Sequence, residues 1–185
     1  EGGAWPILAL REGAREQTGL ILATQGADVR RIDSVAETEA PAFDTDLAQE
    51  SRLVALSALP NRPVERSHML MLGGTMQPYV WTINGAVWGD HLPIAATSGE
   101  RVVLSFHNMS MMAHPMHLHG HHFQVVAIDG HPVVGAVRDT VLVPTMGSVT
   151  VAFDADNPGR WPLHCHNLLH MATGMMTEVV VEGVG

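Results

Sequence analysis

The stretch 159–176, GRWPLHCHNLLHMATGMM, decides how this chain is interpreted, because it contains the only cysteine and places a histidine on either side of it. If His164-Cys165-His166 lies on a β-strand, the alternation of side chains turns both histidines to one face and Cys165 to the other. Three adjacent residues with metal-binding side chains would then serve two sites on opposite sides of one strand.

The cysteine side of this strand can be completed from residues that follow closely. His170 and Met175 come at steps of five, and Gly174 allows the chain to turn back. One thiolate, two imidazoles and a weak thioether form the ligand set of a mononuclear blue-copper site. The second imidazole must come from elsewhere in the chain, and His114 is available.

A second histidine cluster, HPMHLHG at residues 114–120, supplies the remaining candidates. His117 and His119 are two residues apart, so on a strand they share a face. His114 lies three residues before His117, across a proline, and can point the other way. We therefore expect His114 to join Cys165. The group on the opposite face would be His117, His119, His164 and His166.

Two simpler interpretations compete with copper. The histidines could lie on a polar surface beside a buried free cysteine, which behaves as a small hydrophobic residue. A zinc site would use one thiolate with imidazoles, but it has no use for the thioether of Met175. The length of the pattern favours copper over both.

From Ser67 onward, short apolar runs alternate with turn residues such as Gly73-Gly74, Asn84-Gly85 and Asp129-Gly130. This spacing predicts an all-β sandwich. A helical turn is expected only near 167–172. The predicted strands are 69–72, 81–83, 101–107, 122–128, 140–143, 148–153, 159–166 and 177–181, with two more at 5–10 and 19–24 and a weak apolar patch at 53–59.

The two clusters together resemble the copper signature of the multicopper oxidases, which include laccases, bilirubin oxidases and cuprous oxidases. The resemblance runs from His114 to Phe123 and then through His164-Cys165-His166, His170, Gly174 and Met175. It implies a Greek-key β-sandwich of cupredoxin type at 67–185, as the C-terminal domain with the type 1 copper. Residues 1–40 resemble, more weakly, the closing strands of a preceding cupredoxin domain, and 41–66 are expected to be a linker.

The resemblance also implies a role for each candidate residue. The type 1 copper would be held by His114, Cys165, His170 and Met175. His117 would bind type 2 copper, and the type 3 pair would be bound by His119, His164 and His166. A phenol or a metal ion would be oxidised one electron at a time through an exposed imidazole edge of the type 1 site. Electrons would pass from Cys165 to the flanking His164 and His166. Dioxygen would then be reduced to water.

The chain departs from this family pattern in two respects. The trinuclear cluster of the family needs a second pair of His-x-His motifs from an N-terminal domain, and no such pair occurs here. The cluster would have to be completed by an N-terminal cupredoxin domain of the same parent protein or by a neighbouring subunit. The alternative is a stand-alone cupredoxin that carries electrons or binds copper without oxidase activity. Asn167, Leu168 and Leu169 also replace an acidic residue often found before the last histidine.

Composition limits the partners. The net charge of -9 and the sequence pI of about 5.6 argue against nucleic acid and anionic membrane surfaces. The chain also has no apolar run long enough to span a bilayer. A periplasmic or extracellular location follows from the family resemblance alone.

Several neighbouring residues have two interpretations. Asn108 either ends a strand in a turn or hydrogen-bonds near Cys165. Arg138-Asp139 is expected to form a structural ion pair or turn, and the alternative is a catalytic role. The methionines at 109–116 could bind cuprous ions, since thioethers favour Cu(I), or could fill gaps in the core. His121 and His122 match no ligand position.

Overall fold

The computed structural model describes residues 2–41 and 47–183, which belong to two compact units at 1–44 and 45–185. Each unit is described separately below. None of the helices in the described ranges is long and apolar enough to cross a membrane. The domain limits expected at residues 40 and 66 remain predictions.

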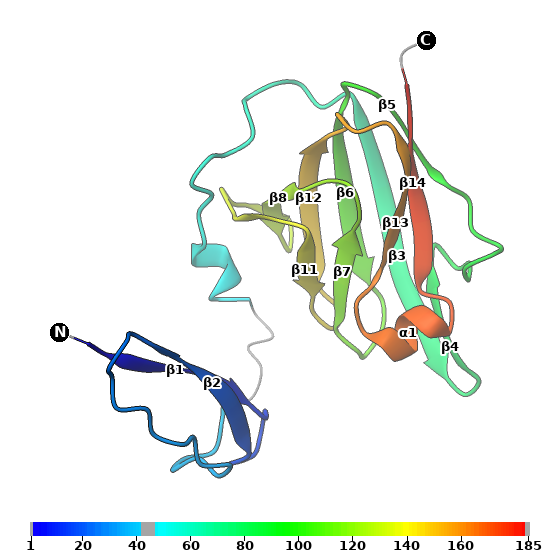
Figure 1. Cartoon of the computed structure of the whole chain (residues 1–185). Helices are drawn as coiled ribbons and strands as arrows, with labels where there is room; N and C mark the ends of the chain where they lie inside the picture. The colour runs from blue at the N-terminus through cyan, green and yellow to red at the C-terminus, as the bar shows by residue number, and fades with distance from the viewer. Residues whose placement is uncertain (1, 42–46, 184–185) are drawn as a thin grey trace. The chain divides into compact units, whose positions relative to one another are not determined.

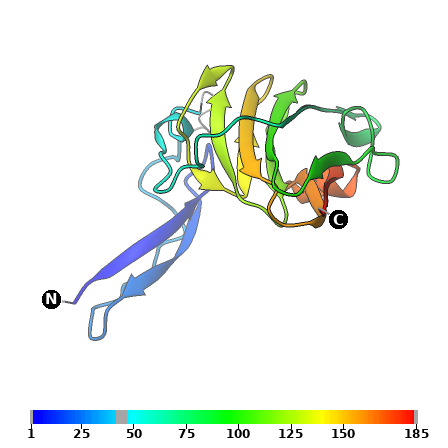
Figure 2. The same cartoon turned by 90° about the horizontal axis from the view of Figure 1, so that it is seen from above.

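The first unit is built on an antiparallel hairpin of β1 (Ala4–Leu10) and β2 (Gln17–Ala23), visible as a long two-stranded ribbon in Figure 2. The register pairs Trp5 with Leu22 and Ile7 with Leu20, so bulky apolar side chains meet across the strands. These four side chains are all more than half exposed. A two-stranded sheet has no second layer in which to bury them.

The second unit contains a larger sheet and a smaller sheet that lie face to face (Figure 1). The order of the larger sheet is β10-β8-β12-β6-β3-β4, with β9 paired to β8. Its pairs are antiparallel except β3 with β6, which run parallel. Its strands are β3 (Arg66–Met76), β4 (Tyr79–Ile83), β6 (Arg101–Asn108), β8 (Phe123–Ile128), β9 (His131–Pro132), β10 (Val137–Arg138) and β12 (Ser148–Asp154).

The smaller sheet has the order β11-β7-β13-β14-β5, in which β14 and β5 run parallel. The short helix α1 (Leu168–Ala172) connects β13 to β14 and lies beside β4 (Figure 1). A 3-10 turn, η1 (Glu50–Arg52), precedes the sandwich. The strands of this sheet are β5 (Ile94–Thr97), β7 (His114–Leu118), β11 (Thr140–Val143), β13 (Gly159–Cys165) and β14 (Met176–Glu182).

Alternating side chains from both sheets fill the space between them. Along β6, Val102, Leu104 and Phe106 are fully buried, whereas the residues between them are partly exposed. Cys165 and Met175 belong to the same buried cluster. The candidate metal-binding cysteine is therefore part of the hydrophobic core.

The predicted all-β sandwich is confirmed, and β11 has the predicted bounds. The predicted strands omitted β5, β7 and the two-residue strands β9 and β10. The apolar patch at 53–59 forms no strand. Most of its side chains are exposed, and none of the strands in the described ranges pairs with it.

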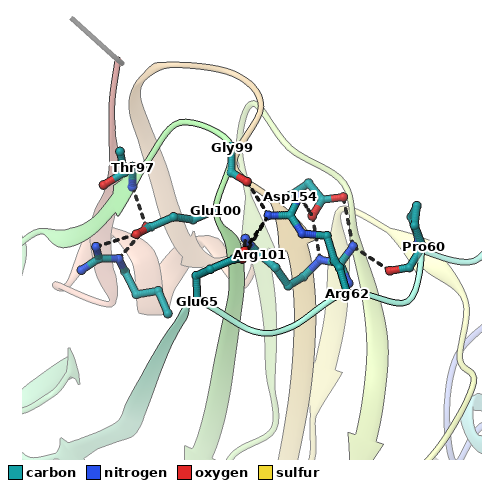
Figure 3. A network of polar contacts seen from close by, with 9 residues as sticks. Pro60, Arg62, Glu65, Thr97, Gly99, Glu100, Arg101 and Asp154 are labelled. Atoms are coloured by element: carbon teal, nitrogen blue, oxygen red, sulfur yellow. Dashed lines mark hydrogen bonds and ion pairs between the residues drawn. The ribbon is translucent and has the colours of Figure 1, made fainter.

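A network of ion pairs ties the chain before β3 to one end of the sandwich (Figure 3). The buried Arg101 guanidinium donates to both oxygens of Asp154 and to the carbonyl of Pro60. A further pair joins Arg66 to Glu100 at the same end. The segment leading into β3 is thus fixed by charge-assisted hydrogen bonds as well as by packing.

Candidate metal centre

The first group of converging ligand atoms comprises His114, Cys165 and His170, all fully buried. The Sγ atom of Cys165 lies 3.7 Å from Nδ1 of His114 and 3.7 Å from Nδ1 of His170. The two Nδ1 atoms are themselves 3.1 Å apart. β7 supplies the first residue, β13 the second and α1 the third, so three elements direct a ligand atom to one point.

A chain of hydrogen bonds sets the orientation of the His114 ring. The amide of buried Asn108 donates through Nδ2 to the carbonyls of Met112 and Pro144, which leaves its Oδ1 to accept from Ser110. The Ser110 Oγ lies 2.8 Å from His114 Nε2. Because the hydroxyl proton is directed to Asn108, its oxygen can accept the Nε2 proton of His114, which leaves Nδ1 free as a ligand.

α1 positions His170 and the chain that follows it. The Asn167 side chain caps the helix by accepting from the Leu169 backbone N–H at 3.2 Å. After the helix, the Met175 N–H donates to the His170 carbonyl, and the Cys165 N–H donates to the Met175 carbonyl. Met175 is fully buried, whereas Met176 is partly exposed.

The electrostatics of the Cys165 group are those of an uncharged cluster. Burial raises the pKa of the Cys165 thiol to about 11. Burial, together with the neighbouring His170, lowers the pKa of His114 to about 4. Burial also lowers the pKa of His170. Around neutral pH the metal-free group therefore holds a thiol and neutral imidazoles.

The second group lies on the opposite face of the same strand and comprises His117, His119 and His164. The Nε2 atoms of His119 and His164 are 3.0 Å apart. The ring centroid of His117 lies 4.7 Å from that of His119, and His166 stacks 6.0 Å from His164. β7 and β13 are adjacent and pair His164 with His117, which accounts for this convergence.

β11 orients His117 from the other side. The Nδ1 atom of His117 lies 2.9 Å from the Asp139 carbonyl oxygen and 3.0 Å from the Thr140 hydroxyl. Arg138 and Asp139 do not pair with each other: Arg138 contacts Glu50 at 3.1 Å, and the Asp139 carboxylate accepts from Thr140. Arg138 thus forms a structural ion pair, as expected, and its partner is Glu50.

The donor atoms fit copper better than they fit zinc or no metal. A soft thiol and two imidazole nitrogens converge in a buried site, and the buried Met175, whose carbonyl accepts from the Cys165 N–H, carries a thioether. A site built only for packing would not direct three polar ligand atoms toward one another. Asn108, which donates to backbone carbonyls, and the Ser110 hydroxyl provide hydrogen bonds of the kind that orient histidine ligands in metal sites.

The expected exposed imidazole edge is absent. Both His114 and His170 have 0% exposure. The Trp81 ring lies 4.2 Å from the His170 ring and 5.1 Å from the His114 ring, and Asn167 lies beside His170 Nε2. Side chains from β4 and α1 thus cover the rings that sequence reasoning placed at the surface.

Three residues that contribute to the site were missed in the sequence. Ser110 has a detectable signal, because it follows Asn108 by two residues, a spacing at which Asx side chains bond the backbone. Thr140 and Trp81 have no local signal. Each reaches its histidine across a strand pair or across the sandwich, so only the fold brings it there. The second interpretation of Asn108 holds in modified form: it acts on His114 through Ser110.

Residues 61–184 match the sequence profile of the multicopper oxidase family. The chain is 38% identical to multicopper oxidase MmcO of Mycobacterium tuberculosis over 96% of its own length, which is 34% of that protein. It is 37% identical to copper resistance protein A of Escherichia coli over 66% of this chain and 19% of the relative. The chain thus spans about a third or less of these curated relatives.

Solved structures agree with the sequence relatives. The multicopper oxidase McoA of Aquifex aeolicus is 25% identical with a TM-score of 0.60, covering 88% of this chain and 37% of McoA. A blue copper oxidase of Nitrosomonas europaea is 26% identical with the same TM-score of 0.60, covering 65% of this chain and 44% of that one. The β-sandwich is therefore of cupredoxin type, and the chain belongs to the multicopper oxidase family.

Proposed function

We propose that this chain is the C-terminal, copper-binding domain of a multicopper oxidase. In this proposal the Cys165 group with Met175 holds type 1 copper. His117 belongs to the type 2 site, and the type 3 site takes His119, His164 and His166. Copper bound in these sites supplies one-electron oxidation of a reducing substrate and, at a complete cluster, reduction of dioxygen to water.

The observation that carries the proposal is the use of one strand for two groups of ligand atoms. Cys165 directs its sulfur to His114 and His170, and its neighbour His164 directs a ring nitrogen to His119 on the other face. The path between the two groups consists of Cys165 and the peptide bonds to its neighbours. An electron carrier needs only the first group, so the second group favours an oxidase.

Each group has a separate task. The His114 and His170 rings and the Cys165 sulfur form a dry, uncharged cluster whose ligand atoms already converge before metal binds, which limits the rearrangement that electron transfer requires. The His119 and His166 side chains are exposed, unlike the first group. Exposure at this face leaves room for ligands from another domain.

We further propose that an N-terminal cupredoxin domain of the same parent protein, or a neighbouring subunit, supplies the remaining histidines. The exposed apolar hairpin of β1 and β2 supports this arrangement, because its apolar side chains would be buried by packing against a second layer of a larger domain. Residues 1–40 would then close the preceding cupredoxin domain, with 41–66 as the linker. A periplasmic or extracellular location, and a phenol or metal ion as substrate, belong to the same proposal.

The test is to load the chain with Cu(II) and record the visible spectrum and the copper count. We expect an intense blue band, and the Cys165→Ser variant should lose the band while keeping the fold, checked by circular dichroism. A colourless, folded wild-type chain would contradict the type 1 assignment. Oxygen uptake with a phenolic donor, with and without a candidate N-terminal domain, separates the oxidase from the stand-alone carrier, which would hold one copper and gain no turnover from the added domain.

A further inference from the structure

Trp81, at the centre of β4, lies against both imidazoles of the Cys165 group. Its ring centroid is 4.2 Å from that of His170, at an interplanar angle of 31°, and 5.1 Å from that of His114, at 65°. It therefore presents its face to the first ring and a nearly perpendicular contact to the second. With 2% exposure, Trp81 is the largest side chain buried beside the group.

The surroundings of Trp81 keep the indole in place. Gly74 is its partner on β3, and a Cβ atom there would stand 2.4 Å from the Trp81 ring, so only glycine leaves the space that the ring fills. The backbone N–H of Trp81 donates to the Thr173 carbonyl just after α1, which fixes the main chain from which the indole projects. The Tyr79 ring packs edge-on at 5.8 Å. The indole is thus confined by the Gly74 backbone and the Tyr79 ring.

The two imidazoles differ in what else restrains them. The angle of a histidine ring about its last bond has only a broad intrinsic preference, so neighbours must set it. The outer nitrogen of His114 has a short contact with Ser110 at 2.8 Å. The outer nitrogen of His170 has only the Asn167 amide, at 3.4 Å. Of the aromatic rings around His170, that of Trp81 is the closest, and it lies against the face of the imidazole.

A second observation separates this role from simple filling of space. The Trp81 Nε1 atom is buried and has no hydrogen-bond partner among the described residues. A buried donor without a partner is unfavourable, and a Phe or Leu at this position would avoid it. The position keeps a wide aromatic face at the expense of an unsatisfied N–H.

We propose that Trp81 is a positioning residue of the Cys165 group. Its face holds the His170 ring, and its edge the His114 ring, in the orientation that directs each Nδ1 to Cys165 before metal binds. The proposal rests on the proposed copper-binding function, and it assigns to β4 a part in the site although β4 supplies no ligand.

Two substitutions test this role, Trp81→Met and Trp81→Phe. The first keeps much of the volume and loses the aromatic face, whereas the second keeps a face. In the copper-free chain, NMR of the histidine rings should show one orientation of His170 in wild type and Trp81→Phe, and averaging in Trp81→Met. In the loaded chain, Trp81→Met should bind Cu(II) about 10- to 100-fold more weakly and have a weaker blue band, and Trp81→Phe should restore most of both.

The control is Phe153→Leu, which removes an equally buried aromatic ring with no ring contact to either imidazole. It should lower stability and leave the NMR signals and the copper band unchanged. A Trp81→Met variant that behaves like this control would overturn the proposal. If Trp81→Met does not fold, Gly74→Ala displaces the indole instead, and Gly73→Ala serves as the control at the neighbouring position. An undisturbed copper site in Gly74→Ala would then overturn the proposed role of Trp81. A wild-type chain that takes up no copper would count against the proposed function. The NMR comparison of the metal-free chains would still test whether Trp81 orients the His170 ring.

Discussion

Gly174, directly before Met175, gives the sharpest test of the geometry around the metal centre. Its φ angle is +127°, which side chains rarely adopt, and a Cβ atom would stand 2.6 Å from Val87 Cγ1 and 2.7 Å from the Trp81 carbonyl oxygen. In Gly174→Ala the backbone conformation costs about 1–3 kcal/mol. The steric contacts add about 1–3 kcal/mol if the neighbouring atoms of Val87 and Trp81 can move aside only in part.

The expected loss is therefore about 2–6 kcal/mol in the free energy of unfolding, which corresponds to a fall in Tm of about 4–24 °C for a chain of this size. Two other glycines divide this loss into its parts. Gly99 has a φ of +90° but nothing within 4 Å, so Gly99→Ala isolates the backbone cost. Gly73 has ordinary space and no positive φ, and its nearest atom is Thr82 Oγ1 at 3.6 Å, so Gly73→Ala should leave stability almost unchanged.

The assay is thermal unfolding followed by circular dichroism, with the copper band recorded on the loaded chain. Because Gly174 precedes Met175, whose carbonyl accepts from Cys165, its displacement should also alter the band, whereas Gly99→Ala should not. If Gly174→Ala is no less stable than Gly99→Ala, the contacts of the added Cβ atom with Val87 and Trp81 cost no stability. That result would refute the steric argument.

Three further perturbations follow from the structure. Met175→Leu should raise the reduction potential of the copper site and cost less than about 1.5 kcal/mol of stability. A potential that responds to Met176→Leu and not to Met175→Leu would show that Met176 is the ligand. Ser110→Ala removes the hydroxyl beside Nε2 of a candidate ligand and should weaken Cu(II) binding about 10-fold or more in a competition titration, whereas unchanged affinity would show that the hydroxyl orients nothing. The Arg101 guanidinium lowers the pKa of Asp154 below its usual 3.8, so this pair stabilises the fold above about pH 4 and is lost as the pH falls through the lowered value. Arg101→Met should therefore be less stable than wild type by urea unfolding at pH 6, with a difference that narrows near pH 3; a constant difference would rule out this linkage.

Much of the geometry of the candidate metal centre could be predicted because it depends on short-range geometry along the chain. The opposite directions of Cys165 and His164 follow from the two-residue period of a strand, and the structure has them on opposite faces, as expected. The shared face of His117 and His119 follows from the same period. These predictions needed only the correct choice of strand over helix.

The parts that failed depend on which elements become neighbours in space. The exposed imidazole edge was wrong because Trp81 of β4, distant in sequence, covers His170. The partner of Arg138 was missed because Glu50 lies far away along the chain. β5 was missed because its four residues carry no pattern of their own and are defined by parallel pairing with β14.

The distance in sequence between β7 and β13 also bears on the order of events during folding. Cys165 and His114 are 51 residues apart, and β14 must pair with β5, whose residues are more than 80 positions earlier. Such long-range pairing is slow, since loop closure must precede any gain from contact. Until β13 finds β7, the thiol is in water with an ordinary pKa and can react with oxidants or with another chain. Cys165, the only cysteine, therefore becomes buried late in folding. A copper ion present before that step encounters a flexible chain whose histidines are not yet close together.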